Sequence, residues 1–242
     1  MRSEGPRDQI FDPFRLSAEP ATGATRKVVT AAAVLAPAFA ALLTSESANA
    51  AADFSNAVPS ALAAYGHTLA LVLVTGSLAV ERVLIKPAMT DAEEELFSKA
   101  DAVYGVAALL ILATGYLRVT ELGKGWDFYS HSPVFWLKLL LFGVLGASSL
   151  FPTIKILQRV VGRSKGEPIE PMSEKLAARM TKIINGELLA VGSIPLAASL
   201  MARGVGYTEW LPWQAGAAPV ALGVFGLTFK YVKEALDWKE GA

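Results

Sequence analysis

Five long apolar runs restrict this chain to a membrane-spanning architecture. A helix needs roughly 20 apolar residues to cross a bilayer, because each residue adds about 1.5 Å to its length. Runs of about that length occupy residues 61–80, 102–119, 133–151, 183–201 and 211–229. The sequence therefore predicts an all-α, polytopic membrane helix bundle whose first expected partner is the lipid bilayer. Its predicted parts are a four-helix membrane domain at 51–207, and a fifth transmembrane helix with an inner-side tail at 208–242.

The amino-acid composition supports a membrane protein and excludes several functional classes. Of the 242 residues, 53% are hydrophobic and 18% are charged, which is too apolar for an ordinary soluble domain of this length. The chain has no cysteine, so disulfides, thiolate-bound zinc and thiol nucleophiles are excluded. A formal net charge of zero and the lack of any binding motif argue against nucleic acid as a partner.

The first fifty residues have the pattern of a targeting region. Residues 1–25 are polar and Pro-rich, and two basic residues then precede an apolar segment at 28–43. The following Ala-Asn-Ala pattern predicts cleavage after Ala50. A polar, transit-peptide-like leader followed by a second signal resembles the bipartite presequences of plastids, which implies a chloroplast thylakoid protein with a lumenal mature N-terminus. The alternatives are a retained helix at 28–43 and a bacterial-type plasma membrane.

The basic residues predict which side of the membrane each loop faces. With the N-terminal end of the first run outside, the inner segments carry 13 Lys and Arg residues, against three in the outer loops. Such a bias toward the inner side is usual in membrane proteins. Residues 152–182 are predicted to form a long inner loop, within which Ser173 is the expected N-cap of an interfacial helix.

His67 is the main candidate for a functional residue. It lies about six residues into the first run, roughly 9 Å below the outer surface. Ionisable side chains in lipid are costly and often functional, and imidazole within a helix bundle suits an axial ligand of haem iron. Two interpretations are open: a cofactor that is haem b or another tetrapyrrole, and a plain interhelical hydrogen bond without a cofactor. His131 lies too high to share that iron and is expected at a helix entry, where Ser132 is the predicted N-cap.

Lys138 is the second candidate for the cofactor site. It lies about five residues inside the third run, at a depth similar to that of His67. One interpretation is that its side chain snorkels outward to the membrane surface. The other is that it neutralises a carboxylate of a ligand bound beside His67. Asp101 and Arg118 lie at the ends of the second run and are expected to be solvated or snorkelling.

Three more charges lie within or at the boundary of the membrane: Glu81, Arg82 and Glu187. Glu81 and Arg82 end the first run on the inner side, and Glu187 is about four residues inside the fourth run from that side. Glu187 is therefore expected to pair with Arg82 or Lys155. Intramembrane charges also leave a small-solute transporter open as a function, although the sequence has no obvious inverted repeat.

Several segments resemble known families. "YGHTLALVLVTGSLAVERVLIKP" and "NGELLAVGSIPLAASLMARGVG" look like blocks of an uncharacterised predicted-membrane-protein family, a domain of unknown function found in cyanobacteria, other bacteria and plastids, over residues 62–207. More distantly, the early histidine, Gly-x5-Arg at residues 76–82 and "FWLKLLLF" are similar to HemJ-type protoporphyrinogen oxidases and CopD-like membrane proteins. The HemJ resemblance implies a haem at His67 and a role for Lys138.

The sequence leaves three functional interpretations. The first is an accessory thylakoid protein that assembles with photosynthetic complexes or with itself, based on small-residue helix faces that allow close packing. The second is a membrane redox protein that binds haem or another tetrapyrrole, and the third is a transporter. No complete catalytic constellation is recognisable, so a non-enzymatic role is favoured and enzyme activity is left open.

Overall fold

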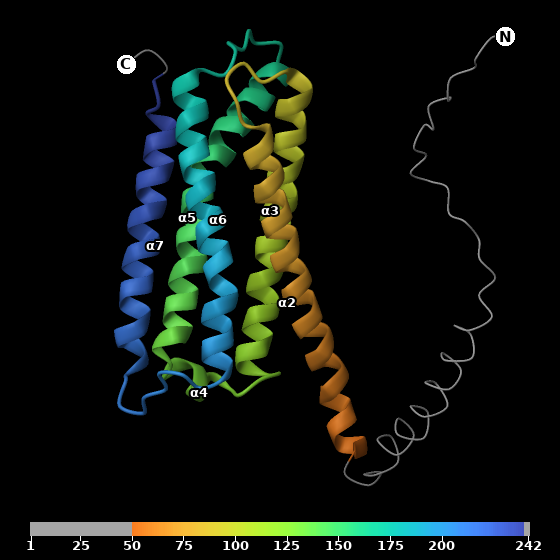
Figure 1. Ribbon diagram of the computed structural model, residues 1–242, viewed down its shortest axis with the longest axis vertical. Helices are drawn as coiled ribbons and strands as arrows, with labels where there is room; N and C mark the ends of the chain where they lie inside the picture. The colour runs from red at the N-terminus through yellow and green to blue at the C-terminus, as the bar shows by residue number, and fades with distance from the viewer. Residues whose placement is uncertain (1–49, 240–242) are drawn as a thin grey trace, which may run out of the picture. The chain divides into compact units, whose positions relative to one another are not determined.

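The computed structural model describes residues 50–239 and confirms an all-helical chain with five helices long and apolar enough to cross a membrane. The helices, drawn in Figure 1, are α2 (Ala50–Leu84), α3 (Asp91–Thr120), α4 (Trp126–Ser130), α5 (Pro133–Ser164), α6 (Glu174–Ala202) and α7 (Trp213–Leu236). Apart from Ala50, the predicted targeting region lies outside the described residues.

The five long helices run alternately up and down, so their connections gather at two ends of the bundle. At one end lie α4 and the residues 203–212 between α6 and α7; we call this the α4 end (Figure 1). At the other lie the short connections 85–90 and 165–173; we call this the Glu94 end. His67 and Lys138 belong to the half of the bundle nearer the α4 end.

Side-chain caps mark where three of the long helices begin. Thr90 and Glu93 form a reciprocal capping box at the start of α3. The Ser132 side chain accepts a hydrogen bond from Phe135 N, and the Ser173 side chain accepts one from Leu176 N. Such bonds satisfy backbone N–H groups that have no partner within the helix. The N-caps predicted at Ser132 and Ser173 are confirmed.

The long inner loop predicted at 152–182 was wrong. Helix α5 continues through Pro152 to Ser164, and α6 begins at Glu174, so only residues 165–173 connect them. Pro152 removes one helical hydrogen bond, but it is buried against neighbouring helices, and such packing permits proline within membrane helices. The prediction took the end of the apolar run at residue 151 as the end of the helix, whereas α5 continues beyond it.

Helix α5 is the central element, because it packs against α3, α6 and α7. Close packing of α5 with α7 depends on glycines: an added Cβ at Gly143 would overlap Val224, and one at Gly216 would overlap Trp136. Between the two ends, an apolar layer draws side chains from α2, α3, α5 and α6; its members are Ala70, Val74, Leu78, Tyr104, Ala107, Ile111, Leu145, Ala190 and Val191. The fifth helix predicted at 211–229 is present as α7, despite the Pro219 within it.

Candidate functional site

Two neighbouring cavities lie on the α4 side of the apolar layer, between α2, α3, α5 and α6. Their volumes are about 290 and 270 Å³, close to the lower limit of roughly 300 Å³ for small-molecule sites. Both are mainly apolar. They share five wall residues, which are His67, Ile111, Lys138, Phe142 and Ile194. The two residues that the sequence assigned to a cofactor site therefore face the same space.

A hydrogen-bond chain fixes the orientation of the His67 ring. Nδ1 of His67 lies 2.9 Å from the Thr114 hydroxyl, and that hydroxyl lies 2.6 Å from the carbonyl oxygen of Leu110, to which it donates. Since a hydroxyl has one hydrogen to donate, it accepts from Nδ1–H of His67. In the neutral ring, the lone pair is then on Nε2, the arrangement found in histidines that bind metals.

Helix α3 approaches the imidazole closely because residue 115 is a glycine. A Cβ added at Gly115 would lie 3.3 Å from Cε1 of His67, closer than most real contacts of that kind. The small residue and the Thr114 hydroxyl one position earlier together seat the ring against α3. Gly105, in contrast, has nothing within 4 Å of an added Cβ, so the tight approach is local to His67.

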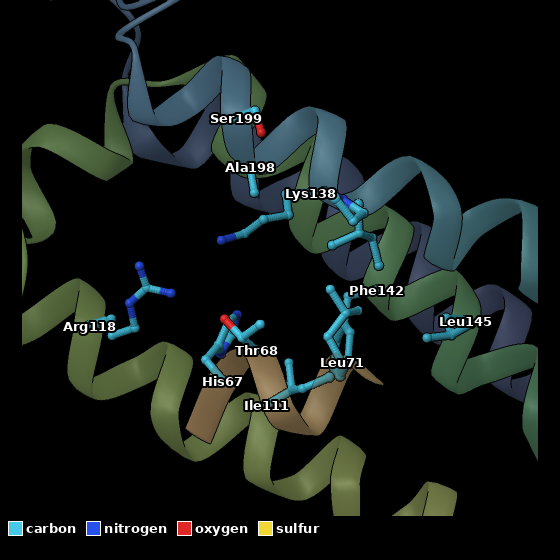
Figure 2. Close-up of a pocket in the computed structure, with 12 residues that line it drawn as sticks. His67, Thr68, Leu71, Ile111, Arg118, Lys138, Phe142, Leu145, Ala198 and Ser199 are labelled. Atoms are coloured by element: carbon cyan, nitrogen blue, oxygen red, sulfur yellow. The ribbon is translucent and has the colours of Figure 1, made fainter. Parts of the chain in front are cut away.

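Two cationic side chains reach the same cavity. Figure 2 shows Lys138 extending from α5 and Arg118 from α3 into the space in front of His67, with Ser199 of α6 on its far wall. Lys138 Nζ lies 5.8 Å from the centroid of the Phe135 ring. Neither cavity has Asp or Glu among its described lining residues. The site therefore presents positive charge within an apolar wall, which suits an anionic ligand.

Arg118 is the residue of this site that sequence reasoning missed. It was expected to be solvated at a span end, and it is indeed exposed, but its guanidinium also lines the cavity. Arg118 follows Thr114 by four residues, which places it on the same side of α3 as the hydrogen-bond partner of His67. That helical spacing was the available signal.

His131 takes no part in either cavity. It ends α4 as its C-cap residue, and its Nδ1 lies 2.7 Å from the carbonyl oxygen of Asp127 and 3.2 Å from the hydroxyl of Ser130. The residue is thus at a helix boundary next to the entry of α5, where the sequence analysis expected it.

A second polar group of residues lies inside the bundle. Glu81 and Glu187 are 2% and 1% exposed, and Glu81 lies within electrostatic range of Asp101 and Glu187. Glu187 Oε1 accepts a hydrogen bond of 3.1 Å from Ser148 Oγ. Asp101 Oδ1 accepts one of 2.7 Å from Thr153 Oγ1. We call Glu81, Asp101 and Glu187 the interior acids.

The hydrogen-bond partner of Glu187 differs from the one expected. The sequence analysis paired Glu187 with Arg82 or Lys155, but its described hydrogen bond comes from Ser148 on α5. Arg82 instead donates from Nε to Asn185 Oδ1 at 2.7 Å. The rotation of α6 about its axis, which turns Glu187 inward, depends on the packing of all the helices and cannot be read from one apolar run.

A third charged cluster joins α3 to α5 at the Glu94 end. Glu94 is fully buried, and its carboxylate binds two arginines: Arg159 Nη2 lies 2.7 Å from Oε1, and Arg163 Nη2 lies 2.6 Å from Oε2. Arg163 also contacts Asp91 at 2.9 Å. The sequence analysis placed both arginines in an inner loop, so this pairing was not predicted. These ion pairs join α3 to α5, which is a structural role.

Comparison with known proteins gives one match. A family model described as Predicted membrane protein (DUF2214) matches residues 59–206. The match runs from α2 to the end of α6 and stops before α7. No curated protein and no solved structure matches the chain significantly.

Proposed function

The chain belongs to the family described as Predicted membrane protein (DUF2214), and from this premise we propose that it binds an anionic tetrapyrrole such as haem in the cavity around His67. The convergence of one histidine and two cations on an apolar cavity is the observation that supports the proposal. A tetrapyrrole with carboxylate side chains combines a flat apolar ring, a central metal and negative charge, and each of these has a counterpart among the lining residues.

Four polar side chains share three roles in this proposal. The Nε2 atom of His67 would hold the metal, and Thr114 fixes the ring orientation through its contact with Nδ1. Lys138 and Arg118 bind the carboxylates of the ligand, with the guanidinium suited to a bidentate pair. Bound haem would supply one-electron redox chemistry. The chain's own residues bind and orient the ligand and exclude water from it.

Titration of the purified full-length protein with haem tests the proposal. We expect a shifted Soret band that His67→Ala abolishes. Lys138→Met and Arg118→Gln should each weaken binding roughly 10-fold or more, because a hydrogen bond to a charged group contributes about 1.5–3 kcal/mol. The dimethyl ester of haem, which lacks the carboxylates, should bind more weakly to the wild type and equally to both charge variants. Equal affinity of the wild type for haem and its ester would contradict the role of the cations.

We propose further that the protein resides in the thylakoid membrane with the α4 end on the lumenal side. The leader pattern of the first fifty residues and the excess of basic residues toward the Glu94 end support this location. Protease treatment of intact and opened thylakoid vesicles tests the orientation, since residues 203–212 should be cleaved only after opening. Cleavage in intact vesicles would reverse it.

Assembly with a larger photosynthetic complex is the second proposed function. Helix α7 supports it, because its outward face carries Leu222, Phe225 and Phe229, each at least 64% exposed, and the helix lies outside the family match. Comigration with a large complex on a native gel, lost when these three residues are changed to alanine, is the expected result. Strictly monomeric behaviour in mild detergent would oppose it.

A further inference from the structure

We propose that Glu81 and Glu187 form a proton-binding site inside the bundle, separate from the His67 cavity. The two side chains come from α2 and α6 and are almost completely buried. Both carry an oxygen that needs a partner: Glu81 Oε1 and Glu187 Oε2 are buried and have no hydrogen-bond partner among the described residues. An acceptor left in this state is costly, and a bound proton removes the negative charge that makes burial so unfavourable.

The charged groups around the site are themselves acidic. Glu81 interacts electrostatically with Asp101 from α3 and with Glu187 from α6. Asp101 also interacts electrostatically with Glu187. Tyr104 of α3 lies within electrostatic range of all three carboxyls. From α5, the site receives hydroxyls, those of Ser148 and Thr153. Like charges that interact in a buried environment disfavour full ionisation, so we expect this group of carboxyls to hold protons.

The arginines nearby are bound to other residues and do not balance the charge of Glu81 or Glu187. Arg82 follows Glu81 in the chain but directs its Nε to Asn185. The arginines of α5, Arg159 and Arg163, are bound to Glu94. Glu94 therefore serves as a comparison for Glu81 and Glu187. It is as deeply buried as they are, but two arginines balance its charge.

A proton is favoured over a metal ion as the ligand. Within residues 50–239, no three His, Asp or Glu side chains are close enough together to hold a metal. Hard cations need six or more oxygen ligands, or a rigid octahedron of them. A proton needs only one carboxylate oxygen and one acceptor. The reaction is simple protonation, in which a carboxylate takes a proton from a hydronium ion of the aqueous phase to become a carboxylic acid, and water is left.

The site is also separated from the His67 cavity. His67 and Glu81 are fourteen positions apart on α2, about 21 Å at the helical rise, and Ala70, Val74 and Leu78 of the apolar layer lie between them with exposures of 0–1%. The interior acids therefore exchange protons independently of any ligand at His67. The proposal does not rest on the tetrapyrrole function.

Infrared spectroscopy of the full-length protein in detergent at pH 7 tests the proposal. We expect a C=O band of protonated carboxylic acids that shifts in D₂O and loses intensity in both Glu81→Gln and Glu187→Gln. The matched variant Glu94→Gln should leave this band unchanged, because two arginines bind the Glu94 carboxylate. No loss of the band in either variant would overturn the proposal.

Chemical labelling gives a second readout that does not depend on spectral assignment. Dicyclohexylcarbodiimide modifies protonated carboxyls in apolar surroundings, so Glu81 and Glu187 should be labelled and Glu94 should not, as read by mass spectrometry of peptides. Replacing potassium by sodium at constant ionic strength should leave the labelling unchanged. Protection by sodium would show that the site holds a cation instead of a proton. Equal labelling of Glu94 would show that Glu81 and Glu187 do not differ from a glutamate bound to arginines, which would overturn the proposal.

Discussion

Substitution of Glu94 by glutamine should destabilise the protein strongly, whereas the same change at Glu187 should be nearly neutral. Both glutamates are at most 1% exposed and both lie on long helices. They differ in their partners, because Glu94 binds two arginines and Glu187 accepts from the uncharged Ser148. Glutamine keeps the size and one acceptor oxygen but removes the charge, so the pair isolates the electrostatic difference.

The structure sets the expected magnitude for Glu94→Gln. Removing one member of a buried ion pair typically costs about 3–5 kcal/mol, because the remaining charge is left without compensation. The lower end applies here for two reasons. Arg163 is 30% exposed and keeps its contact with Asp91, and Arg159 still donates to the carbonyl oxygen of Glu170. We expect a loss of about 3 kcal/mol in the free energy of unfolding, against less than about 1 kcal/mol for Glu187→Gln.

Denaturant unfolding in mixed micelles, followed by circular dichroism, measures both changes. A double-mutant cycle with Arg159→Gln adds a direct test, since the coupling between residues 94 and 159 should be of the order of 1–3 kcal/mol. A Glu94→Gln protein as stable as the wild type would show that the two arginines do not need this carboxylate. The interpretation of Glu94 as a buried ion pair would then be wrong. A Glu187→Gln protein destabilised as much as the Glu94 variant would refute the electrostatic difference between the two sites.

Three further substitutions test other parts of the structure. Gly143→Ala should lower the free energy of unfolding by about 1–3 kcal/mol, because the added Cβ would overlap a valine of α7. The control Gly146→Ala should lower it by less than about 0.5 kcal/mol in the same unfolding assay, because nothing lies within 4 Å of its added Cβ. Ser132→Ala should lower stability by about 0.5–2 kcal/mol through loss of the α5 N-cap, and Ser132→Asp should restore it. Gly115→Ala should displace the His67 ring and weaken haem binding at least several-fold in the titration, with little change in the free energy of unfolding. Unchanged haem affinity would show that α3 does not hold the ring in place.

The long helices were predictable because membrane helices follow from hydrophobic length alone. All five predicted runs lie within observed helices, apart from the first residues of the run at 211–229. The ends of the helices were harder to predict, because they depend on contacts between helices. Pro152 lies in the middle of α5 because buried neighbours hold the helix on both sides of it, and α5 then extends far enough to bring Arg159 and Arg163 to Glu94.

The expectation that His67 and Lys138 lie near each other came from counting residues, which says nothing about the rotation of each helix. Counting residues from the same side of the membrane gave His67 and Lys138 similar depths, and both line the same cavities. The same count did not reveal which way each helix is rotated. Rotation decides that Thr114 meets His67, that Arg118 joins the cavity and that Glu187 faces Ser148. These contacts depend on four helices packing together, which no single apolar run contains.

The absorption spectrum of the protein after reconstitution with haem tests the central claim most directly, with His131→Ala as the matched histidine control. His131 lies outside both cavities and contacts Asp127 and Ser130. We expect the same Soret band in the wild type and in His131→Ala, and its disappearance in a folded His67→Ala protein. An unchanged band in His67→Ala, or a wild type that leaves the spectrum of free haem unaltered, would contradict it.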